Sequence, residues 1–222
     1  MKNILVPTDF SEQAGFALDL AFQIAQKADA KITLLHVIEH AGHKATFLGS
    51  SSLSASVSIS TGVEMDDIYF IQLFKRRKEQ MIEIVSDPRF KKIEFEDKIM
   101  LGTPYHAIEE EITETEADFI VMGTTGVSDW KESMIGSVAE KVVRHASVPV
   151  FTLRQPVALE NIHRIVFASD FKDENTSYTG LVRSLQDFFE AEMNFVYINT
   201  PSSFKDEREI KSVIKSFAQK SD

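Results

Sequence analysis

Residues 118–150 have the sequence DFIVMGTTGVSDWKESMIGSVAEKVVRHASVPV. It opens on an apolar run, residues 119–122, which predicts a buried strand. The strand gives way at Gly123 to a loop that reaches Gly126, and an amphipathic helix begins at Gly136. A second apolar strand follows at residues 148–153. Strands that alternate with helices in this way are typical of a parallel α/β sheet.

The loop and the start of this helix have the residues of an anion site. Glycines that leave a strand let the backbone approach a ligand closely. Gly136 and Ser137 place free N–H groups, a hydroxyl and the positive end of a helix dipole at one point, and phosphate is the anion most often held there. The alternative is a tight βα turn followed by a capping serine. Three glycines and a serine in one strand–loop–helix unit favour the phosphate site.

The motif also carries a family resemblance. The pattern G-x2-G-x9-G-S, followed by V-A-E-K-V-V-R-H-A-S-V-P-V at residues 138–150, resembles the ATP-binding signature of the universal stress protein family. The spacing matches that signature without a gap. The resemblance implies a doubly wound, nucleotide-binding α/β fold, with a five-stranded parallel sheet in the order 3-2-1-4-5 and helices on both faces.

The preceding sequence fits such a domain over residues 1–154. Residues 3–8 and 31–38 predict buried strands, joined by a helix with Ser11 as its N-cap, so the two strands should be parallel. A helix over residues 64–86 and a third strand over residues 95–101 follow. The basic run 75–78 and the acidic run 109–111, both on predicted helices, are expected on solvated faces. Residues 41–62 form a Ser-rich loop, which is either a lid or a disordered insertion.

Carried over residue by residue, the resemblance implies an ATP pocket and no catalytic residue. Asp9, at a strand end, could also hold Mg²⁺ through water, or act only as a helix N-terminal carboxylate. The pocket positions are Pro7, Thr8 and Asp9 for adenosine, the backbone of Val37 for the adenine edge, Met122, Gly123 and Gly126 for ribose and phosphates, and Gly136, Ser137 and Val138 for the phosphates.

An internal repeat begins after a linker at residues 155–161. Residues 4–10, ILVPTDF, reappear as residues 165–171, IVFASDF, and residues 30–37 match residues 191–198 at the same offset of 161. Residues 162–222 therefore predict a partial β-α-β repeat and the start of a helix. A two-stranded sheet cannot bury its faces alone. The chain is therefore expected to be a fragment of a tandem protein; the alternative is that the repeat completes a sheet from another chain.

Composition narrows the function classes. A net charge of −10 argues against nonspecific DNA or RNA binding. No apolar run approaches the roughly 18–20 residues of a membrane span. Cysteine is absent, which suits a reducing cytoplasm. His36, His40 and His43 have a loose ligand-like spacing but no matched carboxylates, so no metal site is expected.

These observations favour a nucleotide-dependent stress-response or signalling module. One alternative is a nucleotide-independent interaction module, a homodimer or pseudo-dimer that pairs through the edge strand 148–153. Another is a slow ATPase, although no motif places a general base or a Lys or Arg against the phosphates.

Overall fold

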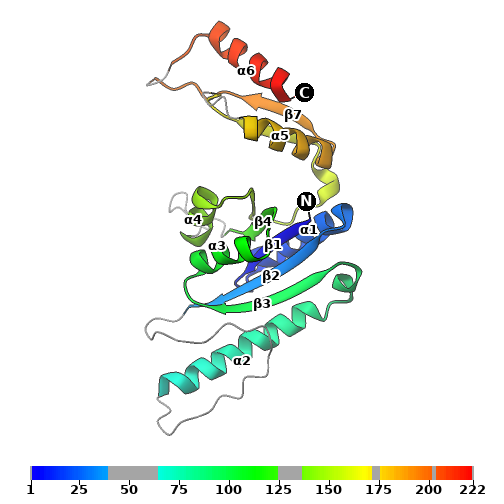
Figure 1. Cartoon of the computed structure of the whole chain (residues 1–222), viewed down its shortest axis with the longest axis vertical. Helices are drawn as coiled ribbons and strands as arrows, with labels where there is room; N and C mark the ends of the chain where they lie inside the picture. The colour runs from blue at the N-terminus through cyan, green and yellow to red at the C-terminus, as the bar shows by residue number, and fades with distance from the viewer. Residues whose placement is uncertain (1, 40–64, 125–136, 172–175, 202–203, 222) are drawn as a thin grey trace. The chain divides into compact units, whose positions relative to one another are not determined.

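The computed structural model describes residues 2–39, 65–124, 137–171, 176–201 and 204–221. The chain forms two compact units, Met1–Val157 and Ala158–Asp222, and most of their elements are labelled in Figure 1. The boundary between the units falls within the predicted linker. The first unit contains β1 (Asn3–Thr8), α1 (Glu12–Ala28), β2 (Lys31–Ile38), α2 (Met65–Val85), a 3-10 helix (Pro88–Lys92), β3 (Phe95–Leu101), α3 (Pro104–Glu114), β4 (Phe119–Gly123), α4 (Ser137–His145) and β5 (Val150–Leu153).

The five strands of the first unit form one parallel sheet in the order β3-β2-β1-β4-β5. The predicted doubly wound sheet and its strand order are confirmed. In the central strand β1, Ile4 pairs with Ile32 of β2 on one side and with Phe119 of β4 on the other. The apolar runs occupy central strands, whereas the edge strand β3 carries charged side chains such as Lys98, because a central strand is covered on both faces.

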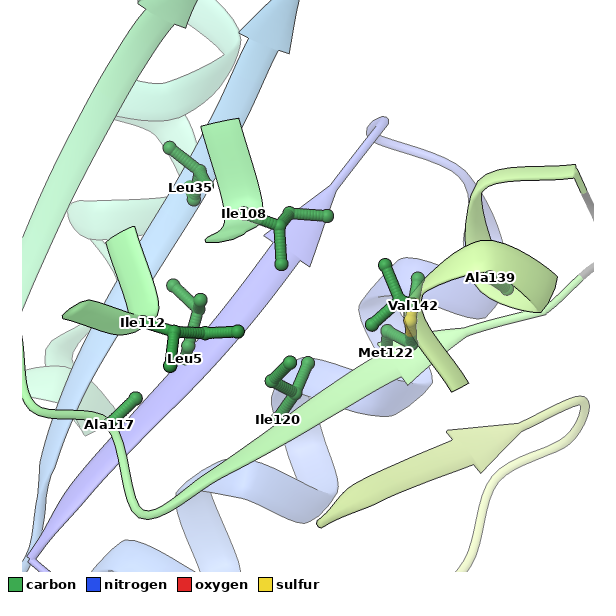
Figure 2. Close-up of a cluster of buried hydrophobic side chains, with 9 residues drawn as sticks. All are labelled: Leu5, Leu35, Ile108, Ile112, Ala117, Ile120, Met122, Ala139 and Val142. Atoms are coloured by element: carbon green, nitrogen blue, oxygen red, sulfur yellow. The ribbon is translucent and has the colours of Figure 1, made fainter. Parts of the chain in front are cut away.

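The core on one face of this sheet is the set of side chains in Figure 2. Leu5, Leu35 and Ile120 project from the strands toward α3 and α4, and α1 lies on the far side of the sheet. Helices therefore cover both faces. Each fully buried leucine or isoleucine contributes roughly 1.5–3 kcal/mol relative to exposure. The cluster comprises Leu5, Leu35, Ile108, Ile112, Ala117, Ile120, Met122, Ala139 and Val142.

Local chemistry explains where α1 and β5 begin. Ser11 is the N-cap of α1, as predicted, and its Oγ accepts a hydrogen bond from the N–H of Ala14 at 3.2 Å. β5, the last strand of the first unit, begins at Val150 rather than at the predicted Val148. Pro149 has no N–H to donate to a sheet ladder, although its carbonyl accepts from Ile120 at 2.9 Å.

The expectation that the acidic run 109–111 lies on an exposed face is wrong for Glu111. This side chain is fully buried, and its Oε1 accepts a hydrogen bond from Lys98 Nζ at 2.6 Å. Glu111 follows Ala107 and Ile108 by one helical turn, so it shares their inward face. Burial raises the pKa of the Glu111 carboxyl, and Lys98 opposes that effect.

Within residues 158–171, 176–201 and 204–221, the second unit has two strands and two α-helices. β6 pairs with β7 in parallel, with Arg164 opposite Glu192. Each of these two residues lies 161 positions after its counterpart in the β1–β2 pair, Asn3 and Lys31. Phe167, Phe171, Phe195 and Phe217 pack together. None of the helices in the described part of the chain is both long and apolar enough to cross a membrane. The elements are a 3-10 helix (Leu159–Asn161), β6 (Arg164–Ala168), α5 (Thr176–Phe189), β7 (Glu192–Val196) and α6 (Glu207–Ser221).

Candidate functional site

The carboxyl ends of β1 and β4 lie on neighbouring strands, at the point where the order of the sheet reverses. Ligands of open α/β sheets bind outside the strand ends at such a point. Pro7 and Thr8 end β1, and Asp9 follows directly. Met122 and Gly123 end β4. The sheet therefore brings together two segments of the predicted site that are more than a hundred residues apart in sequence.

The turn after β1 is fixed by its own hydrogen bonds. Thr8 Oγ1 accepts from the N–H of Phe10 at 3.1 Å, and Asp9 Oδ1 accepts from the N–H of Ser11 at 2.9 Å. Phe10 has a left-handed backbone, with φ of 66°, which is costly for a residue with a side chain. Asp9 is exposed, and a carboxylate has about four acceptor positions, so the turn leaves acceptor capacity for a ligand.

Gly123 has a packing reason to be glycine. A Cβ at this position would lie 2.4 Å from the carbonyl carbon of Gln13 and 2.6 Å from the N of Ala14. The backbone of the first turn of α1 therefore occupies the space that a side chain would need. Close approach of the backbone was predicted here, but the neighbour that the structure shows is α1.

Ser137 and Thr124 differ in exposure. Ser137 is exposed and is the first residue of α4, where free N–H groups favour anions. Thr124 is buried, and its Oγ1 donates to the carbonyl of Leu153 at 3.3 Å, so its hydroxyl ties β4 to β5. Gly126 and Gly136 lie outside the described residues.

The apolar members of the predicted site belong to the core or its margin. Met122 is buried in the cluster of Figure 2. Val37, near the end of β2, and Val138, in α4, are half-buried and pack against that cluster. Their side chains are explained by packing, so any direct contact of Val37 with a ligand would be made by its backbone.

His36, which sequence reasoning considered only as a possible metal ligand, lies at this edge of the sheet. It lies in β2, beside Thr8 in the register, and its Nδ1 is 2.8 Å from the Thr8 carbonyl oxygen. Its ring centroid is 4.4 Å from that of Phe10. Burial lowers the pKa of His36 and Arg77 acts in the same direction, whereas the Thr8 carbonyl and Asp9 act in the opposite one. A buried polar residue within an apolar strand was the available signal.

Among the described residues, no three His, Cys, Asp or Glu side chains are grouped so that they could hold a metal ion. Asp9, directly after β1, offers a carboxylate, and the start of α4 offers backbone N–H groups and the hydroxyl of Ser137. Groups of this kind suit a ligand that has both hydroxyls and an anionic part. The fold defines a doubly wound α/β protein whose switch point lies between β1 and β4, the place where sheets of this kind bind their ligands.

Comparison with known proteins identifies the family. The family model "Universal stress protein family" matches residues 1–154, and the chain belongs to this family. Universal stress protein MJ0577 of Methanocaldococcus jannaschii is 30% identical over 159 residues, which cover 69% of this chain and 95% of that protein.

Solved structures of the family extend the likeness. The structure of MJ0577 aligns with 71% of this chain and 98% of its own, at 27% identity and a TM-score of 0.52. A universal stress protein of Archaeoglobus fulgidus aligns with 98% of this chain and 73% of its own, at 18% identity and a TM-score of 0.65. The similarity to the Archaeoglobus fulgidus protein is one of fold, and the aligned part of this chain includes the second unit.

Proposed function

We propose that the first unit binds ATP at the ends of β1 and β4, and that nucleotide occupancy makes the chain a stress-response or signalling module. The observation that carries the proposal is the arrangement of the strand ends. Asp9 directly follows β1 and Gly123 ends the neighbouring strand β4, on either side of the switch point, where α/β proteins bind nucleotides. Membership of the universal stress protein family supports it.

The proposed pocket uses the predicted residues. Adenosine would lie against Pro7, Thr8 and Asp9, with the backbone of Val37 at the adenine edge. The acceptor capacity of Asp9 suits a ribose hydroxyl or a water molecule bound to Mg²⁺. Met122, Gly123, Gly126, Gly136, Ser137 and Val138 would line the ribose and phosphates.

Two solved universal stress proteins hold a nucleotide, cAMP in one and AMP in the protein from Arabidopsis thaliana. Their TM-scores against this chain are 0.43 and 0.46. ATP is therefore proposed as the ligand from this chain's own residues, and in particular from the anion site expected at Ser137.

A calorimetric titration of the full chain with ATP and Mg²⁺ tests the proposal. Wild-type protein should bind one ATP, and Ser137→Ala should weaken binding by roughly ten- to a hundredfold, the effect of one lost hydrogen bond to a charged group. Ser184→Ala, an exposed serine of the second unit, is the matched control and should bind like wild type. A wild-type protein that fails to bind ATP would overturn the proposal.

We further propose that residues 162–222 are an incomplete second repeat of the first unit. The β1–β2 and β6–β7 pairs share one register at an offset of 161. The left-handed residues Phe10 and Asp29 recur at the same offset as Phe171 and Glu190. This unit has the equivalent Asp170 but no glycine loop, so it is not expected to bind ATP by itself.

Dimerisation is the second candidate function. β5 lies at one edge of the sheet, and an exposed edge strand invites pairing with another strand. We propose that this edge mediates a homodimer or a pseudo-dimer. Thr152→Pro removes a ladder donor at the edge and should shift the molecular mass measured by light scattering from dimer to monomer. A wild-type protein that is already monomeric at high concentration would exclude the homodimer.

A further inference from the structure

His36 contacts both residues that flank Asp9 in the turn after β1. Its Nδ1 lies 2.8 Å from the carbonyl oxygen of Thr8, the residue before Asp9. Its ring packs against Phe10, the residue after Asp9, at a centroid distance of 4.4 Å. A carbonyl oxygen only accepts hydrogen bonds, so Nδ1 carries the proton and donates it. His36 thus contacts both neighbours of Asp9, whose carboxylate is proposed to bind the nucleotide.

Phe10 has a second neighbour, a cationic one, in Arg77. The guanidinium carbon of Arg77 lies 5.5 Å from the centre of the Phe10 ring, within cation–π range. Arg77 belongs to the basic run 75–78, which was expected to be a solvated face; Lys75 and Arg76 are exposed, whereas Arg77 is half-buried. The turn is therefore held from β2 through His36 and from α2 through Arg77.

The second unit shows that the turn does not need a histidine to form. Phe171, the equivalent of Phe10, is also left-handed, with φ of 50°. Ser169 Oγ accepts from its N–H at 3.0 Å, as Thr8 Oγ1 does in the first unit. The position of His36 is taken by Tyr197, whose ring lies 5.3 Å from Lys205 Nζ. Since the same backbone forms without the histidine, turn formation alone does not explain His36.

We propose that His36 is a positioning residue of the nucleotide site: its hydrogen bond to the Thr8 carbonyl fixes the turn so that the Asp9 carboxylate points at the ligand. The inference rests on the proposed function of the first unit. It assigns to β2 a role beyond the contact of Val37 with adenine. Residues that orient a ligating group act through geometry, and an error of about 1 Å in that geometry weakens function strongly.

Three variants of the full chain separate the hydrogen bond from the ring. His36→Phe keeps an aromatic ring against Phe10 and removes the donor. We expect it to weaken the affinity for ATP with Mg²⁺ about tenfold, since one buried acceptor loses its partner. His36→Asn loses the ring but keeps an N–H donor near the position of Nδ1, so its loss should be less than about threefold. Tyr197→Phe, the matched change in the second unit, should leave affinity unchanged.

A double-mutant cycle tests whether His36 acts through Asp9. Asp9→Asn should weaken binding, and adding His36→Phe to it should change affinity by less than about twofold, because the carboxylate to be positioned is gone. Equal losses in His36→Phe and His36→Asn would overturn the inference. It would also be overturned if His36→Phe had the same effect in the wild-type and Asp9→Asn backgrounds, or none at all.

The failures of the two proposals can be told apart. Wild-type protein that does not bind ATP contradicts the proposed function and this inference with it. Wild-type protein that binds ATP while His36→Phe binds equally well contradicts only the inference. Circular dichroism of each variant confirms that it is folded, and His36→Leu, which also lacks the N–H donor, replaces His36→Phe in the cycle if His36→Phe does not fold.

Discussion

Gly123 is a residue whose role in packing can be separated from its proposed role in binding. An alanine Cβ there would come within 2.4 Å of the backbone of Gln13, and backbone can move only if α1 shifts away from β4. We predict that Gly123→Ala lowers the free energy of unfolding by about 1–3 kcal/mol. Denaturation by urea measures this.

Gly15→Ala is the matched control for that substitution. Gly15 lies in α1, and a Cβ there would meet nothing within 4 Å. Alanine favours a helix over glycine by about 0.5–1 kcal/mol, so this variant should be slightly more stable than wild type. If Gly123→Ala were as stable as Gly15→Ala, the close approach of α1 to β4 would be contradicted.

The pH dependence of stability follows from His36. Its pKa in the folded chain lies below the ordinary histidine value of about 6.5, chiefly because of burial. Between the folded and unfolded pKa values the unfolded chain binds more protons, so the free energy of unfolding rises with pH. The contribution of neutral His36 is fully present above pH 6.5 and declines as the pH falls toward the folded pKa.

Urea denaturation of wild type and His36→Asn between pH 5 and 7.5 checks this dependence. The variant keeps every other titratable group, so the difference in unfolding free energy between the two proteins should shrink as the pH falls. A difference that stays constant, or that grows at lower pH, would contradict a depressed pKa for His36.

Single residues also show what a sequence pattern can and cannot predict. Ser11 was predicted as an N-cap because the capping preference is local, and the structure confirms it. Glu111 was placed wrongly because an acidic run suggests a solvated face, whereas burial depends on the partner Lys98, which lies on a different element. Contacts such as that of Gly123 with α1 are likewise set by the tertiary structure.

At the scale of elements, β1 and β6 are equivalent strands in different surroundings. Leu5 of β1 is fully buried under α3 and α4, whereas Val166, the matching residue of β6, is 64% exposed. We predict that Leu5→Ala destabilises the chain by about 2–5 kcal/mol. Val166→Ala should change stability by less than about 0.5 kcal/mol, as surface substitutions do.

Thermal unfolding of the two alanine variants, followed by circular dichroism, provides this comparison. A large loss in Val166→Ala would show that the exposed face of β6 is covered in solution. That outcome would contradict the exposure of this face and would identify it as an interface.

Elements with strong apolar runs were predicted at close to their observed positions. The sequence predicted the strands β1, β2 and β4 because central parallel strands are apolar along their length. The start of β5 was predicted two residues too early, at Val148, because Pro149 interrupts the ladder. Strand order came from the family resemblance, since hydrophobic pattern identifies strands but does not say which of them are neighbours.

At the scale of the whole molecule, the chain divides after Val157 into two compact units. All the residues proposed to bind ATP precede this boundary. We predict that residues 1–157 alone fold and bind ATP within about twofold of the affinity of the full chain, since independent domains contribute separately. Calorimetry on the two proteins compares them. If the shortened chain folds but loses ATP, the second unit must contribute to the site.

The nucleotide content of the freshly purified 222-residue chain shows directly whether the protein binds ATP. The protein is denatured, and the nucleotides released into the supernatant are separated by anion-exchange chromatography against standards. We predict ATP bound to the purified chain, or stoichiometric binding of added ATP with Mg²⁺ if the protein is purified empty. A protein that is purified empty and binds no added ATP would contradict this prediction.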